Sequence, residues 1–180
     1  MPLIRQLTIL IVLAFLLQGC ISAPPKGGSA TAQEGELNAQ AFFCPHDSCE
    51  QRMVAAIGSA KHSVDAAVYS FTSPQIAGAL LKAQNNGAKV RVVADLEQSE
   101  AQNSQIEGLA RRGIETRIFQ KGVTMHNKFA VIDNSLVITG SFNWTKSAAY
   151  YNRENFVMLF DSDLAQDYEK EFFRLWIEAG

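Results

Sequence analysis

The stretch HNKFAVIDNSLVITGSFN, residues 126–143, decides the fold of this chain and carries its most specific residue pattern. Two apolar, β-branched runs, 128–133 and 136–141, are separated only by Asn134 and Ser135. Because asparagine tolerates a positive φ, the pattern predicts two strands joined by a tight two-residue hairpin. In that register Lys128 faces Ser141, and His126 faces Asn143 if the pairing extends so far.

Four polar side chains are therefore expected at the open end of this hairpin. Side chains alternate along a strand, so His126 and Lys128 point the same way, as do Ser141 and Asn143. Directly opposed Cβ atoms lie about 5 Å apart. Asp133 lies at the turn, about 17 Å along the strand from Lys128. We expect it to form hydrogen bonds there rather than to donate a proton.

This combination of side chains suits a phosphate diester. An ammonium neutralises a non-bridging phosphate oxygen, and a hydroxyl and an amide donate hydrogen bonds to others. A neutral imidazole can attack phosphorus as a nucleophile. The pattern thus predicts phosphodiester cleavage centred on His126 and Lys128, with Ser141 and Asn143 binding the phosphate.

The spacing resembles the signature of the phospholipase D superfamily. The matching pattern is His126-x-Lys128-x4-Asp133-x6-Gly140-Ser141-x-Asn143. The chain around it is similar to the short bacterial endonucleases of that superfamily, which carry one copy of the motif.

The resemblance implies a mechanism and a set of site residues. His126 would form a covalent phosphohistidine, and Glu154 would orient it through a hydrogen bond. The catalytic residues implied are His126, Lys128, Asp133 and Glu154. No metal and no other cofactor would be required.

The chemistry also needs a second histidine, which protonates the leaving oxygen. The other two histidines, His46 and His62, have no lysine two residues later and no following Gly-Ser-x-Asn. The second motif should therefore come from another copy of the chain. We expect a two-fold homodimer that completes the active site.

Strand and helix patterns alternate through the first part of the domain. Strands are expected over 38–43, 63–71, 89–94, 114–119 and 155–160, and helices over 48–59, 74–85, 104–112 and 163–178. Ser48 is a candidate N-cap, Pro74 suits a first helical position, and Gly87 and Gly113 end helices. The alternation predicts an α/β layered sandwich, with a mixed, mostly parallel central sheet flanked by helices.

The N-terminus resembles an exported lipoprotein. Arg5 precedes an apolar run over 7–17, and Leu17-Gln18-Gly19-Cys20 resembles a bacterial lipobox. We expect a signal peptide at 1–19, a flexible tether at 20–36 and a catalytic domain at 37–180. Ile21 after the cysteine, rather than Asp, favours anchoring to the outer membrane from the periplasm. The alternative is an ordinary signal peptide and a soluble periplasmic or secreted protein.

Composition places limits on the substrate. The chain is 47% hydrophobic with a net charge of −2, or −3 once Arg5 is removed with the leader, so it is no strongly basic nucleic-acid coater. Residues 82–128 nevertheless hold eight basic and five acidic residues. This excess predicts either a local basic face near the motif or a merely solvated surface.

Cys44 and Cys49 bracket four residues, Pro45 to Ser48. In an oxidising periplasm a disulfide is the preferred interpretation. The alternatives are a zinc site that includes His46 or His62, or free thiols.

Aromatic residues also follow the motif and lie in the last predicted helix. Trp144, Tyr150 and Tyr151, with Lys146, could contact nucleic acid or belong to the core or a dimer interface. Phe172, Phe173 and Trp176 have the spacing of a helix face in the core.

Three function classes are compatible with these patterns. The favoured one is a nuclease with little sequence preference, acting on DNA, with RNA as the other nucleic acid. The second is a phospholipase D-type lipid phosphodiesterase, and the third is a non-catalytic nucleic-acid-binding lipoprotein. The intact motif residues argue against the third.

Overall fold

The computed structural model describes residues 38–180. The predicted signal peptide, the lipidation of Cys20 and the tether lie outside the described residues. They stay predictions, together with the periplasmic location, and fatty-acid labelling of Cys20 would test the lipidation.

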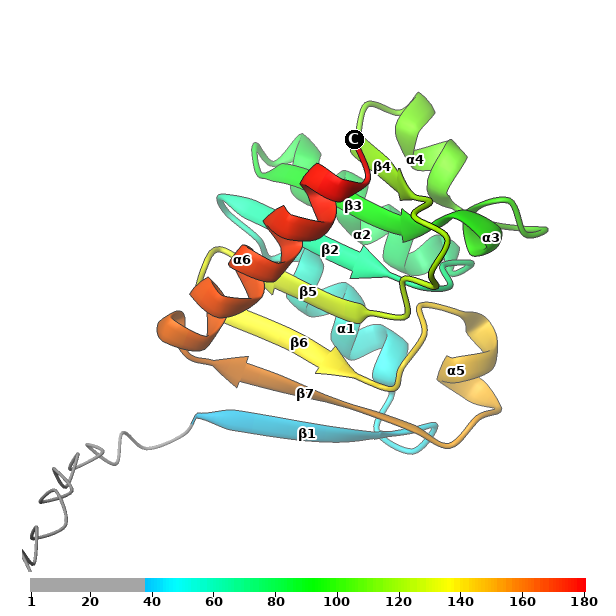
Figure 1. Ribbon diagram of the computed structural model, residues 1–180. Helices are drawn as coiled ribbons and strands as arrows, with labels where there is room; N and C mark the ends of the chain where they lie inside the picture. The colour runs from blue at the N-terminus through cyan, green and yellow to red at the C-terminus, as the bar shows by residue number, and fades with distance from the viewer. Residues whose placement is uncertain (1–37) are drawn as a thin grey trace, which may run out of the picture. The chain divides into compact units, whose positions relative to one another are not determined.

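Seven strands form one mixed sheet in the order β1-β7-β6-β5-β2-β3-β4 (Figure 1). The strands are β1 (Ala39–Cys44), β2 (Ser63–Val68), β3 (Lys89–Asp95), β4 (Glu115–Phe119), β5 (Lys128–Ile132), β6 (Leu136–Gly140) and β7 (Glu154–Phe160). The α/β class is confirmed, but the expectation of mostly parallel pairing is wrong. Only β2–β3 and β3–β4 pair in parallel, while the other four pairs are antiparallel.

The connections explain the two parallel pairs and the pairing of β5, β6 and β7. Parallel neighbours need a long crossover, usually through a helix, whereas antiparallel neighbours can be joined by a short link. Helical crossovers join β2 to β3 and β3 to β4. From β5 onward the chain turns back on itself, so β5, β6 and β7 pair in antiparallel fashion.

Helices cover both faces of the sheet. They are α1 (Cys49–Gly58), α2 (Pro74–Asn85), α3 (Leu96–Ser99), α4 (Ile106–Arg111), α5 (Lys146–Tyr150) and α6 (Ser162–Glu178). Helix α6 crosses one face, and α1 and α2 lie on the other (Figure 1). Sequence periodicity did not predict α3 and α5, because four or five residues are too few to show it. None of the helices within 38–180 has the length and apolar character needed to cross a membrane.

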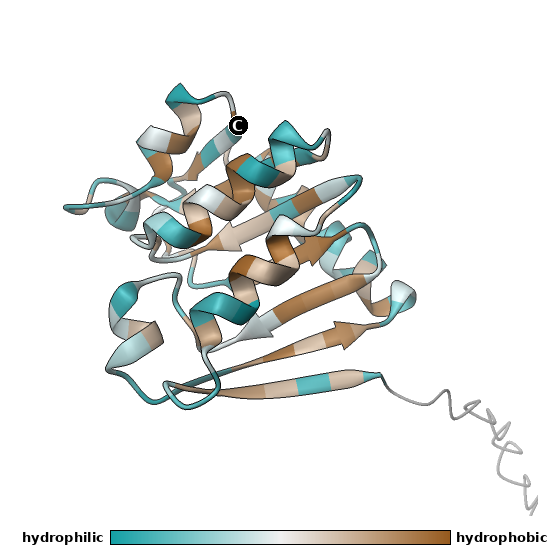
Figure 2. Cartoon of the chain, turned by 180° about the vertical axis from the view of Figure 1, so that it is seen from behind, coloured by the Kyte–Doolittle hydropathy of each residue, from teal (hydrophilic) through white to brown (hydrophobic). Residues whose placement is uncertain are grey.

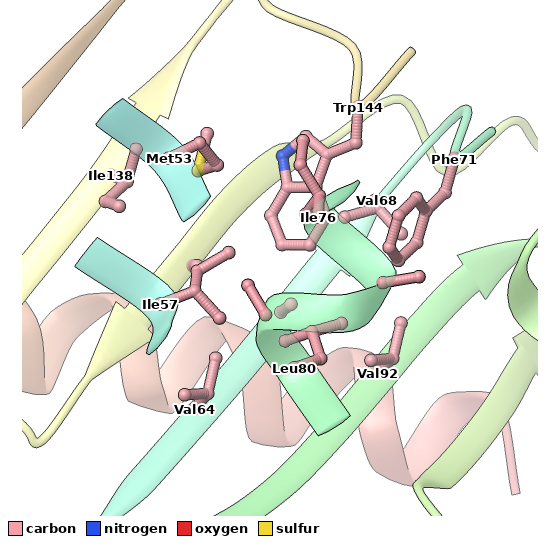
Figure 3. Close-up of a cluster of buried hydrophobic side chains, with 14 of the residues drawn as sticks. Met53, Ile57, Val64, Val68, Phe71, Ile76, Leu80, Val92, Ile138 and Trp144 are labelled. Carbon is pink, nitrogen blue, oxygen red and sulfur yellow. The ribbon is translucent and has the colours of Figure 1, made fainter. Parts of the chain in front are cut away.

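The core has a layer on each side of the sheet. Ile57, Leu80 and Ile138 are buried between the sheet and α1 and α2, and Trp144 is buried with them (Figure 3). On the other face α6 contributes Phe172 to the second layer. Seen from behind, the central strands are hydrophobic, whereas the helices mix hydrophobic and hydrophilic residues (Figure 2).

Two expectations about the helices need correction. Phe173 is 43% exposed and is therefore not a core residue. It is exposed because it lies one position along α6 from the buried Phe172, and so on another side of the helix. Ser48 precedes α1, but its φ is 53° and its side chain makes no capping hydrogen bond. Pro74, Gly87 and Gly113 lie as predicted, and both glycines have a positive φ.

The predicted disulfide between Cys44 and Cys49 is confirmed. It joins the end of β1 to the first residue of α1. Cys44 also pairs with Glu154 at the start of β7. The cross-link therefore fixes the chain beside one of the predicted site residues.

A buried charged cluster lies between α6 and the sheet. Arg91 donates two hydrogen bonds to Asp65, at 2.6 and 2.7 Å, and its guanidinium lies 5.2 Å from the centre of the Phe172 ring. Glu169 is buried beside this pair. Burial, and then the negative charge of Asp65, raise the pKa of Glu169 to about 7.

Glu169 should make stability depend on pH. An unfolded glutamate releases its proton near pH 4.5, but the folded protein retains it up to about pH 7. The contribution of this proton is complete below pH 4.5 and is lost as the pH rises through 7. We therefore expect Glu169→Gln to stabilise the protein by roughly 2 kcal/mol at pH 8, with a much smaller effect at pH 4.5. Thermal denaturation at both pH values measures the difference, and an equal effect at both would contradict the prediction.

Candidate active site

The polar residues of the motif gather at one edge of the sheet. Strands β2, β3 and β6 end at this edge, and β5 and β7 begin there (Figure 1). His126 and Lys128 lie at the start of β5, Ser141 and Asn143 follow β6, and Glu154 opens β7. The structure thus brings these five residues to the same edge.

The register of the hairpin differs from the prediction by one residue. Ile132 pairs with Leu136, and Phe129 pairs with Thr139, so the turn has three residues instead of two. Asp133 and Asn134 both adopt a positive φ, at 52° and 51°, which removes Asp133 from the strand. Continuing this register sets Lys128 opposite Gly140, not opposite Ser141.

The conformation after β6 requires glycine at position 140. The amide groups of Ser141 and Phe142 both donate to the carbonyl oxygen of Asn155, at 3.0 and 3.3 Å. This draws the two backbones together, and a Cβ at position 140 would lie only 2.6 Å from the Cα of Phe156. Gly140 therefore serves the packing of β6 on β7, which positions Ser141 and Asn143.

The Tyr69 ring lies close to both His126 and Lys128. The Tyr69 and His126 rings are 4.4 Å apart between centres and inclined by 57°. The ammonium of Lys128 lies 5.0 Å from the centre of the Tyr69 ring. Lys128 also donates to the backbone carbonyl of His126 at 2.6 Å, so the two motif residues are held against one aromatic ring.

Lys128 is a half-buried cation. Burial lowers its pKa below the ordinary value, and the nearby carboxylate of Glu154 partly offsets the shift. The lysine and the glutamate are thus close enough to interact electrostatically. A partly desolvated ammonium attracts an anion more strongly than one in water.

Glu154 forms hydrogen bonds with other residues than His126, its predicted partner. Its carboxylate accepts hydrogen bonds from the Ser141 hydroxyl at 2.5 Å and from the Asn152 amide at 3.1 Å. Within the described chain it makes no hydrogen bond to His126, so its orienting role stays a prediction. Ser141 in turn accepts from the Asn155 amide, which ties it to β7.

Asn143 has an amide oxygen that is buried and has no hydrogen-bond donor among residues 38–180. Buried polar atoms normally have a partner. This oxygen is an acceptor and a phosphate diester has no donor to offer it, so the phosphate-binding role of Asn143 stays a prediction.

Asp133 lies at the opposite edge of the sheet from this cluster. Its carboxylate accepts hydrogen bonds from the backbone amides of Lys61, His62 and Ser63, between 2.7 and 3.2 Å. Burial would raise the pKa of Asp133, but these hydrogen bonds outweigh it, and the pKa lies below the ordinary value. Asp133 fixes the turn to the start of β2 and is not part of the cluster, although the motif counts it with the catalytic residues.

Sequence reasoning missed two residues of the site. Tyr69 directly follows β2, and Asp95 ends β3. The buried Asp95 carboxylate accepts a hydrogen bond from the backbone amide of Met125 at 3.0 Å, and so positions the residue before His126. Polar residues at the ends of two buried parallel strands were the available signal.

The remaining candidates are placed as follows. The imidazole of His46 lies 3.3 Å from the Arg153 guanidinium, and His62 lies by the Asp133 turn. Trp144 is a core residue, whereas Lys146 is exposed. Residues 38–180 contain no group of three or more His, Cys, Asp or Glu side chains arranged to hold a metal ion.

Comparisons with known proteins give a family match and several similar proteins. Residues 53–176 match the family model described as cardiolipin synthase, PLD-like domain. The chain is 40% identical over 135 residues to a mitochondrial cardiolipin hydrolase of Xenopus laevis, covering 74% of this chain and 64% of that protein. The chain thus spans less than two thirds of that relative.

Two solved structures share the fold over nearly their whole length. One is Nuc, a phospholipase D family member from Salmonella typhimurium, with a TM-score of 0.76 and 32% identity, covering 81% of this chain and 97% of Nuc. The other is NucT from Helicobacter pylori, with a TM-score of 0.71 and 25% identity, covering 79% of this chain and 98% of NucT.

Proposed function

We propose that this chain, which belongs to the phospholipase D superfamily, is a phosphodiesterase that cleaves DNA through a covalent phosphohistidine. The observation that carries the proposal is the placement of His126 and Lys128 against Tyr69, at the edge where Asn143 and Glu154 also lie. An imidazole and a desolvated ammonium so placed can attack a phosphate and bind its oxygens.

The proposed reaction has two displacements at phosphorus. A ring nitrogen of His126 attacks and forms a P–N bond while the P–O bond to the leaving group breaks. A second histidine gives the leaving oxygen its proton. Water then attacks phosphorus and gives a proton to that histidine, and the P–N bond breaks to restore His126. Lys128 stabilises the negative charge on the phosphate oxygens throughout, and no step in this scheme requires a metal.

The second histidine is proposed to be His126 of the partner subunit. His126 is exposed at the sheet edge, and His62 lies at the opposite edge by the Asp133 turn. A two-fold axis near this edge would bring two copies of His126 to one phosphate. Such an isologous dimer contains two identical halves of the site.

We favour nucleic acid as the substrate, because the chain matches Nuc and NucT over a larger share of their length than it matches the cardiolipin hydrolase. The chain covers nearly all of Nuc and NucT. Its single motif resembles that of the short endonucleases of the superfamily. We propose DNA as the main substrate and RNA as the alternative nucleic acid.

A specific observation also supports a second candidate, a lipid phosphodiesterase. The relative with 40% identity is called a cardiolipin hydrolase.

One assay separates these candidates. The full-length chain, purified in detergent, is given plasmid DNA and cardiolipin vesicles in parallel, with EDTA present. We expect the plasmid to be nicked in EDTA, because the proposed nucleophile is a side chain and not a metal-bound water. Gel electrophoresis measures the nicking, and phosphate-ester analysis of the lipids measures vesicle cleavage.

Other outcomes of the assay contradict separate parts of the proposal. Cleavage of cardiolipin without nicking would replace the nuclease by the second candidate and keep the mechanism. Nicking that appears only on addition of a metal ion would contradict the phosphohistidine mechanism.

A further inference from the structure

An open pocket lies next to the candidate active site and is not used by the proposed chemistry. Its volume is about 720 Å³. It is lined by Thr72, Gln75, Asn103, Lys146, Tyr150 and Tyr151. This volume is in the range of small-ligand sites in proteins, roughly 300–1,000 Å³.

Two segments of backbone lead from the site to the pocket. The segment after β2 runs beside the segment after β6, since the Trp144 amide donates to Ser70 at 3.0 Å and the Thr72 amide donates to Trp144 at 2.9 Å. Thr72 is three residues beyond Tyr69, and Lys146 is three residues beyond Asn143. Three residues span at most about 10 Å, the length of an extended chain. A group attached to the bound phosphate would reach the pocket.

The wall of the pocket formed by Tyr150 is held in place by hydrogen bonds to a buried carboxylate. The Tyr150 hydroxyl donates to the buried carboxylate of Glu50 at 2.7 Å, and the Ser73 hydroxyl donates to the same carboxylate at 2.5 Å. These bonds join α1, α2 and α5. The ring of Tyr151, by contrast, is 74% exposed, and its hydroxyl makes no hydrogen bond within residues 38–180.

The lining groups fit a nucleotide. An exposed tyrosine ring offers a face on which a base can stack, and the ammonium of Lys146 can meet the next phosphate. The amides of Gln75 and Asn103 each carry a donor and an acceptor, as the edge of a base does. A glycerol headgroup has no aromatic face to stack.

We propose that this pocket binds the nucleobase next to the scissile phosphate, with Tyr151 as the stacking residue. The inference rests on the proposed nuclease function and adds a base-binding subsite to it. The subsite would favour single-stranded substrate, because a base must leave its stack in a duplex to enter the pocket.

The test compares two single strands that differ only in their bases. The full-length chain is assayed on a short oligothymidylate and on the same strand with abasic residues. Tyr151→Ala is expected to lower kcat/KM on the oligothymidylate by about tenfold, because base–aromatic stacking is lost. The loss on the abasic strand should be several times smaller. Tyr151→Phe keeps the ring and should keep most of the activity on oligothymidylate.

Phe160→Ala is the matched control. Phe160 is another exposed aromatic residue, 41% accessible, at the opposite end of β7. The Phe160→Ala variant should cleave the oligothymidylate and the abasic strand with the same kcat/KM as the wild type. Thermal denaturation checks that each variant is folded.

Several results would overturn the inference. Equal losses of Tyr151→Ala on both strands would show that the ring does not contact a base. Dissociation of Tyr151→Ala into monomers during sedimentation would make the pocket wall a subunit interface instead. Wild-type chain that cleaves cardiolipin vesicles and neither strand would show that the proposed function had failed, and the subsite with it.

Discussion

His126→Ala is expected to lower the rate of phosphodiester cleavage by more than about 10³-fold, the scale seen when an enzyme loses its nucleophile. The variant should fold normally, because the His126 side chain is exposed and the structure shows no hydrogen bond from its ring within residues 38–180. Initial rates on plasmid DNA, with thermal denaturation as a check of folding, measure the effect. His62→Ala removes an exposed histidine at the other edge of the sheet and should retain full activity.

The same variant tests the shared active site. If two copies of His126 act on one phosphate, an inactive subunit also inactivates its wild-type partner. After wild type and an equal amount of His126→Ala exchange subunits, the activity of the starting wild-type enzyme should fall to about one half, because only wild-type pairs remain active. Activity that is unchanged by mixing, or wild-type His126 activity in a strict monomer, would contradict the proposed dimer.

Gly140→Ala is expected to have the largest effect on stability. A Cβ at this position would lie 2.6 Å from the Cα of Phe156 and would also overlap the carbonyl of Asn155. Neither backbone atom can move without separating β6 from β7. We expect a loss of about 3 kcal/mol in the free energy of unfolding, at the upper end for an overpacked core. Urea denaturation measures it, and activity should fall as Ser141 and Asn143 shift.

Gly78→Ala is the matched control for this prediction. Gly78 lies inside α2, and a Cβ there would meet no atom within 4 Å. Alanine is favoured over glycine in a helix by about 1 kcal/mol, so this variant should be slightly more stable than the wild type. Equal effects of the two substitutions would show that the close approach at Gly140 carries no energetic cost.

The sequence predicted most of the elements and the members of the site for local reasons. Alternation of apolar residues depends on the period of a strand, and helix ends depend on residues such as Pro74, Gly87 and Gly113. The spacing from His126 to Asn143 placed the polar residues at the open end of a hairpin. These features involve neighbours along the chain, so no knowledge of distant contacts was needed.

The pairing between strands that are distant in sequence could not be predicted from local sequence patterns. The mostly parallel sheet was wrong because the order β7-β6-β5-β2 depends on which strands the folded chain brings side by side, and not on the pattern within any strand. Tyr69 and Asp95 escaped notice for the same reason. Tyr69 follows β2, Asp95 ends β3 and His126 precedes β5, and only the sheet brings the three together.

The hairpin at 126–143 shows where local information ends. Its strands, the presence of a turn between them and its polar residues follow from the sequence alone. Its register does not, because the amides of Lys61, His62 and Ser63 bind the Asp133 carboxylate and hold that residue in the turn. Three amides from a distant segment thus decide that Lys128 lies opposite Gly140. The sequence by itself determined which residues carry the chemistry, and the tertiary structure decided which of them face one another.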